Sequence, residues 1–106
     1  MKILVVEPNE KPKIAEIEST LEAEQKIVGG LIEMVFPPNH PDDCCIICNE
    51  EGKFNGSLPN RPIRLEDGSI YDIVFGTFFL CRAAEDSEDF DSLTDEQIEY
   101  YTRLYR

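Results

Sequence analysis

The chain has 106 residues, of which 22 are Asp or Glu and 10 are Lys or Arg, giving a formal net charge of −12 at pH 7. This length suits one domain and is too short for two independent cores, and a hydrophobic content of 42% is too high for a disordered chain of this charge. Because the charge repels nucleic-acid phosphates, we do not expect direct DNA or RNA binding.

The first third of the chain predicts a β-hairpin followed by a short helix. Residues 2–7 (KILVVE) form an apolar run typical of a buried strand, and residues 12–18 (PKIAEIE) predict a second strand after a turn. Ser19 and Glu22 match a capping box, and Gly29-Gly30 is a helix stop. A helix of about two to three turns is therefore expected between them.

The middle of the chain predicts further strands. Residues 31–36 are apolar and end at Pro37 and Pro38, and residues 44–50 (CCIICNE) form a second apolar run. Residues 52–64 are rich in Gly, Pro and Asn and predict a loop, and residues 66–69 predict a turn. The run 70–82 predicts two strands, or one with a bulge, divided at Gly76.

A helix is expected at the C-terminus. Thr94 and Gln97 match a capping box, and Ile98, Tyr101, Leu104 and Tyr105 share one helical face that should dock on a sheet. The elements together predict an α+β fold: one mixed or antiparallel sheet of about five to six strands packed with two helices, in a single domain over residues 1–106.

The residues usually used in catalysis and metal binding form no complete pattern. Cys45 and Cys48 make a CxxC, but residues three apart on a strand point to opposite faces, and no second pair follows. With Cys44 and Cys81 they are expected to be buried, reduced thiols, and His40 a surface loop residue. Enzymatic activity is thus the minority hypothesis, and no cofactor or metal is expected.

The chain contains no long apolar run and no signal-peptide core. A membrane-spanning helix needs about 18 or more consecutive apolar residues, and Glu7 and Pro8 interrupt the first apolar stretch. We therefore expect a cytoplasmic protein without a membrane segment.

One segment of this acidic chain carries only positive charge. Residues 52–65 contain no acid, and the expected ligand-binding residues lie here: Lys53, Phe54, Asn55, Asn60, Arg61 and Arg64. Arginine matches a phosphate with two parallel hydrogen bonds, side-chain amides can read a sugar or base, and an aromatic ring can stack on a base. The alternative is that the arginines pair with neighbouring acids and that Pro59-Asn60 only shapes a connection.

The opposite charge dominates residues 85–99, where eight of fifteen residues are acidic. Such a segment is usually a solvated loop and helix start. It could also be a row of carboxylates that imitates a phosphate backbone for a basic protein.

Three blocks of the sequence resemble a known family. They are residues 1–33, residues 47–63 (ICNEEGKFNGSLPNRPI) and residues 71–81 (YDIVFGTFFLC). They are similar to the domain of unknown function 3846, found in Gram-positive bacteria, phages and conjugative elements. The chain departs from the family pattern at Cys44, Cys45 and Ser57.

The resemblance implies a mobile-element origin, sometimes beside antirestriction-type domains, and supplies no settled activity. Combined with the cationic segment, it suggests an anti-defence protein that sequesters a phosphate-bearing signal, such as a cyclic nucleotide or an ADP-ribose derivative. A homo-oligomer is expected because one short loop encloses little of a nucleotide. The alternative is an acidic nucleic-acid mimic that blocks a basic site on a host defence protein.

Overall fold

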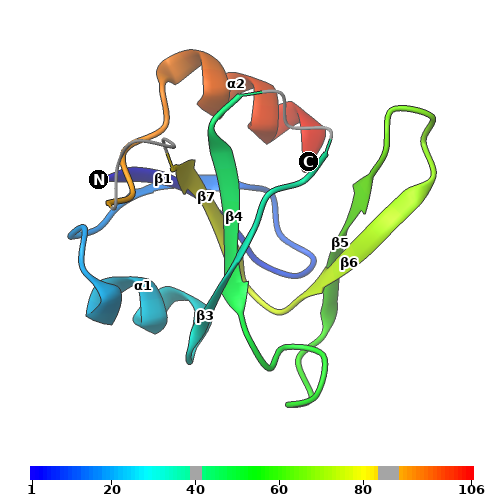
Figure 1. Ribbon diagram of the computed structural model, residues 1–106, viewed down its shortest axis with the longest axis horizontal. Helices are drawn as coiled ribbons and strands as arrows, with labels where there is room; N and C mark the ends of the chain where they lie inside the picture. The colour runs from blue at the N-terminus through cyan, green and yellow to red at the C-terminus, as the bar shows by residue number, and fades with distance from the viewer. Residues whose placement is uncertain (39–41, 84–88) are drawn as a thin grey trace.

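The fold is a five-stranded antiparallel sheet with a separate β-hairpin and two helices (Figure 1). The computed structural model describes residues 1–38, 42–83 and 89–106. Within them the sheet order is β2-β1-β7-β4-β3, and β5 pairs only with β6. The elements are β1 (Lys2–Val6), β2 (Lys13–Glu16), α1 (Leu21–Val28), β3 (Ile32–Val35), β4 (Cys44–Asn49), β5 (Pro59–Arg64), β6 (Ile70–Phe75), β7 (Phe78–Arg82) and α2 (Asp95–Leu104).

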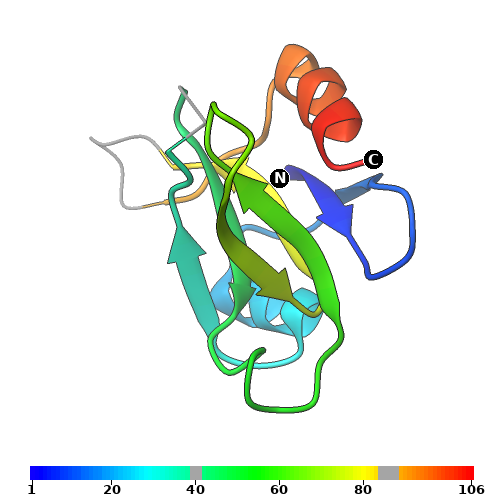
Figure 2. The same cartoon turned by 90° about the vertical axis from the view of Figure 1, so that its right-hand side faces the viewer.

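Both faces of the central sheet are apolar, because successive side chains of its inner strands point alternately into two buried clusters. On one face, Ile3, Ile47 and Phe79 pack with Val28 of α1. The other face is covered by α2 and by the β5–β6 hairpin, which crosses the sheet in Figure 2. The second cluster includes Leu4, Val6, Ile46, Phe78 and Leu80 from the sheet, Ile98, Tyr101 and Tyr105 from the α2 region, and Ile63 and Val74 from the hairpin.

This architecture confirms the predicted α+β class, and every strand pairing is antiparallel. The helix signals were mostly right. Thr94 and Gln97 form the predicted capping box, and Gly29 ends α1 with φ 81°, a conformation that favours glycine. The cap of α1 is Thr20 rather than Ser19, since its hydroxyl accepts the Ala23 N–H at 3.2 Å.

Two local predictions were wrong. Residues 59–64 form strand β5, not the end of a loop, because a strand paired on one side only tolerates the missing N–H groups of Pro59 and Pro62. Leu104, expected on the buried face of α2, is 43% exposed, and Tyr105 reaches the core from the helix cap.

The cysteines lie where the strand pattern predicts. All four are free and buried, and Cys45 and Cys48 belong to the clusters on opposite faces of the sheet. Burial raises the pKa of the Cys48 thiol to about 11, so this thiol stays protonated and poorly reactive at neutral pH. In the described residues, no group of three potential metal ligands comes together. His40 lies outside the described residues.

A buried carboxyl on α1 provides a test of this packing. Glu24 is only 5% exposed, and burial raises its pKa above the ordinary value. Because the folded state favours the protonated acid, stability should be highest below the pKa of the unfolded chain and fall as pH rises through the folded pKa. Glu24→Gln should therefore raise the free energy of unfolding at pH 7 by about 1 kcal/mol relative to wild type, with little change near pH 4.

Urea unfolding at both pH values measures this effect. Glu22→Gln is the matched control, because Glu22 lies in the same first turn of α1 and is exposed. If the free energy of unfolding depended on pH in the same way in both variants, burial of Glu24 would not be the cause of that pH dependence.

Candidate functional site

Three arginines of this acidic chain line a small hollow between β5 and the end of α2. Its walls come from six residues, which we call the arginine pocket: Arg61, Pro62, Arg64, Leu104, Tyr105 and Arg106. The hollow has a volume of about 200 Å³, and among the described residues none that line it has an acidic side chain. Arginines are therefore three of the six lining residues, in a chain of net charge −12.

Arg61 is held in place by neighbouring protein groups. Its Nε donates to the Tyr105 carbonyl at 2.8 Å, and its Nη1 donates to the Asn60 side-chain oxygen at 2.8 Å and to the Asn60 carbonyl at 3.5 Å. Its Nη2 donates to the Glu10 carbonyl in the β1–β2 turn. These contacts engage most of the five N–H donors of the guanidinium. Arg61 thus joins β5 to the end of α2 and contributes its charge from a fixed position.

Arg64 and Arg106 are much freer. Arg64 donates from Nη1 to the Gly68 carbonyl at 2.8 Å, which leaves most of its donors available, and both side chains are exposed. No carboxylate in residues 1–38, 42–83 and 89–106 forms an ion pair with Arg61, Arg64 or Arg106. The pairing of arginines with acids that the sequence left open is therefore not seen in that part of the chain.

An irregularity in β5 accounts for the presence of both Arg61 and Arg64 at the same hollow. Residues three apart on a regular strand point to opposite faces. The β5–β6 register shifts between Ile63 and Arg64, and this irregularity accompanies the turn of Arg64 toward the side of Arg61.

Asn60 acts within the fold. Its Nδ2 donates to the Val6 carbonyl at 2.8 Å and to the Gly76 carbonyl at 2.9 Å, while its Oδ1 accepts from Arg61. The amide therefore links β5 to β1 and to the β6–β7 turn, where Gly76 has φ 79°. It positions Arg61 and has no free donor for a ligand.

The other residues proposed from the sequence lie away from the arginine pocket. Lys53 and Phe54 line a separate hollow of about 300 Å³ beside β3 and β6. Lys53 Nζ is 2.7 Å from Asp72 Oδ1, and this hydrogen bond raises the pKa of Lys53 and lowers that of Asp72. The Asn55 side chain accepts the Ser57 N–H at 3.0 Å, which closes a local turn.

Sequence reasoning missed half of the pocket wall. Leu104 ends the predicted helix, and Tyr105 and Arg106 follow it, but no local signal links this helix end to β5. That link depends on the Arg61 contact with the Tyr105 carbonyl, which spans 44 positions of the sequence. Only tertiary packing reveals it.

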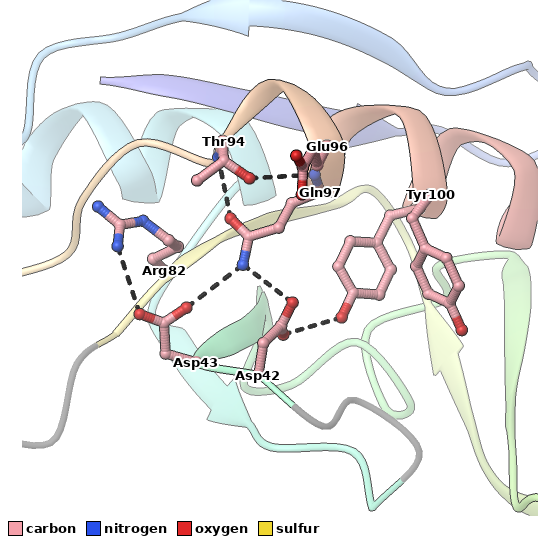
Figure 3. Close-up of a pocket in the computed structure, with 8 residues that line it drawn as sticks. Asp42, Asp43, Arg82, Thr94, Glu96, Gln97 and Tyr100 are labelled. Atoms are coloured by element: carbon pink, nitrogen blue, oxygen red, sulfur yellow. Dashed lines mark hydrogen bonds and ion pairs between the residues drawn. The ribbon is translucent and has the colours of Figure 1, made fainter.

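A larger hollow of about 410 Å³ lies at the start of α2 (Figure 3). Here Gln97 Nε2 donates to Asp42 Oδ2 at 3.0 Å and to Asp43 Oδ1 at 3.3 Å, and Tyr101 donates to Asp42 Oδ1 at 3.0 Å. Arg82 Nη1 lies 3.4 Å from Asp43 Oδ2. These polar groups form hydrogen bonds and an ion pair with one another, and the network joins α2 to the start of β4.

The acidic segment is only partly described, because residues 84–88 lie outside the described ranges. Asp91 pairs with Arg82 at 2.9 Å, Asp95 with Lys2 at 3.5 Å, and Glu99 with Arg103 at 3.4 Å. Several carboxylates of the segment thus already have cationic partners in the same chain.

Comparisons with known proteins place the chain in one family. The family model described as "Domain of unknown function (DUF3846)" matches residues 1–106, so the chain belongs to this family, as the three sequence blocks predict. No curated protein and no solved structure matches the chain. Neither helix in the described ranges is long and apolar enough to cross a membrane.

Proposed function

We propose that this member of the DUF3846 family is a binding protein that sequesters a phosphate-bearing ligand, such as a nucleotide signal, in the arginine pocket without chemistry. The observation that carries the proposal is the meeting of Arg61, Arg64 and Arg106 around one hollow, to which the described part of the chain contributes no acidic side chain. Arg61 also has a structural role, but Arg64 and Arg106 are exposed and form no ion pair with a described carboxylate, so stability gives little reason for their position beside it.

Guanidinium chemistry favours a phosphate in this position. A guanidinium and a phosphate form two parallel charge-assisted hydrogen bonds, and each bond to a charged group contributes about 1.5–3 kcal/mol. Arg64 has the free donors for this geometry, and Arg61 is already oriented by the protein. Preorganised Arg61 needs little further ordering when the ligand binds.

The size of the hollow limits how much of the ligand it encloses. Pockets for complete small ligands usually measure about 300–1,000 Å³, which exceeds the 200 Å³ found here. The arginine pocket suits a phosphate group, and the remainder of a nucleotide would extend outside it. A second copy of the chain could cover that remainder, which is why we include homo-oligomerisation in the proposal.

The anti-defence role is part of the same proposal. It is supported by the family resemblance to phage and mobile-element proteins and by a binding site that offers anchoring groups rather than a nucleophile. Sequestration requires only that the ligand be held.

A thermal-shift screen against cyclic dinucleotides and ADP-ribose derivatives tests the proposal. Ligand at a hundredfold excess over its dissociation constant should stabilise the protein by about 2.7 kcal/mol, and tenfold to hundredfold weaker binding in Arg64→Ala should reduce this to about 1.4–0.4 kcal/mol. If none of these ligands raised the melting temperature of the wild-type protein, the proposal would be rejected. The acidic-mimic hypothesis would then predict salt-sensitive binding to a basic protein, unchanged by Arg64→Ala.

A further inference from the structure

The two edges of the central sheet differ in how they are protected. β2 forms one edge and carries Lys13 and Glu16, the kind of charged residues that discourage unwanted strand pairing. β3 forms the other edge and contains a single charge, Glu33. Along and beside β3, three large apolar side chains are 48–59% exposed: Leu31, Met34 and Phe36.

The hydrogen bonds of β3 show which backbone groups face outward. The Glu50 N–H donates to the Leu31 carbonyl at 2.8 Å, and Glu33 pairs with Cys48 two positions along. Because such pairs alternate in an antiparallel ladder, Ile32 and Met34 direct their N–H and C=O groups away from β4. The described residues supply no partner for these groups. The β3 edge can therefore accept another strand.

The side chains of β3 divide by face. Ile32 packs with the cluster on the α1 side, so Met34 lies on that same apolar side. Glu33 and Val35 line the 300 Å³ hollow on the hairpin side, together with Glu50 and Asp72. Among the described residues, Lys53 is the one cation lining that hollow, and Asp72 already binds it. An added strand would thus meet apolar side chains on one face and excess negative charge on the other.

We propose that β3 binds an extended segment of a partner protein in which basic and apolar residues alternate. Main-chain hydrogen bonds to Ile32 and Met34 would add the segment to the sheet as a sixth strand. Its basic side chains would face Glu33 and Asp72, and its apolar side chains would cover Met34. Local charge selects this occupant over a second copy at this edge, since the β3 strand of another copy would bring its own Glu33 to a face that already carries Glu33, Glu50 and Asp72.

A pair of synthetic peptides provides the probe. One alternates lysine and valine, and the other has the same composition arranged as a lysine block followed by a valine block. General attraction to the acidic surface is similar for both, but only the alternating peptide can present a basic face and an apolar face as a strand. Fluorescence anisotropy should show that the wild-type protein binds the alternating peptide about tenfold or more tightly.

Variants at matching positions locate the site. Met34→Pro removes an outward N–H group, a loss that an edge strand tolerates. If this variant fails to fold, Met34→Lys replaces it, because a charge on an edge strand opposes pairing with another strand. Both should abolish the preference for the alternating peptide. The controls are Ile14→Pro and Ile14→Lys, because Ile14 faces outward on the opposite edge by the same hydrogen-bond alternation and is 59% exposed.

Three outcomes would overturn the inference. They are equal affinity for the two peptides, a preference that survives in the Met34 variants, and a wild-type dimer in sedimentation that Met34→Lys disperses. The last would assign the β3 edge to a second copy. Because Arg64→Ala should leave peptide binding unchanged, failure here is distinguishable from failure of the arginine pocket.

Discussion

Replacing Arg64 with alanine should weaken binding of a phosphate-bearing ligand by about tenfold to a hundredfold, because one or two charge-assisted hydrogen bonds are lost. The substitution should leave the ligand-free melting temperature almost unchanged, since the one side-chain hydrogen bond that Arg64 forms within the described residues is to the exposed Gly68 carbonyl. Isothermal titration of the strongest ligand from the thermal-shift screen measures the change in affinity.

Arg103→Ala is the matched control for this experiment. It also removes one positive charge near the end of α2, but Arg103 pairs with Glu99 and does not line the arginine pocket. The affinity of the Arg103→Ala variant for the ligand should remain within about twofold of wild type, as expected for an exposed charge outside the pocket. Equal losses in both variants would show that ligand binding depends on net charge and not on the pocket.

Asn60→Ala should lower the free energy of unfolding by about 2 kcal/mol. The substitution leaves the Val6 and Gly76 carbonyls without their amide donors and removes the acceptor that orients Arg61. Because Arg61 would lose its fixed position, ligand affinity should also fall in the fraction that remains folded. Urea denaturation measures the stability change.

Asn55→Ala provides the comparison. Asn55 is exposed and closes a turn with Ser57, so its removal should change stability by less than about 0.5 kcal/mol. If both asparagine variants were equally stable, the contacts of Asn60 would not hold β5 against β1.

Much of the fold was predictable because its signals are local. The apolar runs of β1, β4 and β7 exceed what a solvent-exposed segment would carry, and Gly29 and the Thr94–Gln97 capping box mark helix ends directly. The opposite orientations of Cys45 and Cys48 follow from the twofold period of a strand alone.

The misses have a common physical origin. Pro59, Asn60 and Pro62 favour turns as individual residues, and only their pairing with β6 makes them a strand. That pairing carries Lys53 and Phe54 away from Arg61, although they are close in sequence. The hydrogen bond from Arg61 to the Tyr105 carbonyl, 44 positions further along the chain, likewise holds Arg106 at the same hollow as Arg64. Long-range packing decided which cations meet.

The unusual electrostatics of the chain give the proposed site its selectivity. A small anion inside the arginine pocket would lie closest to its cationic lining residues Arg61, Arg64 and Arg106, and charges more than about 8–10 Å away would be largely screened at physiological salt. A long nucleic acid would instead extend over the acidic remainder of the surface and be repelled. The same surface charge would attract the basic strand that we propose for β3.

Titration of isotopically labelled protein with pyrophosphate, followed by NMR, tests the central claim most directly. The account predicts saturable shifts of the amide signals at Arg64 and at Leu104 to Arg106, with Phe54 and Glu99 almost unchanged, and a midpoint at about tenfold to a hundredfold higher pyrophosphate concentration in Arg64→Ala. Small unsaturated shifts spread over the molecule, or saturable shifts confined to residues away from the arginine pocket, would contradict it.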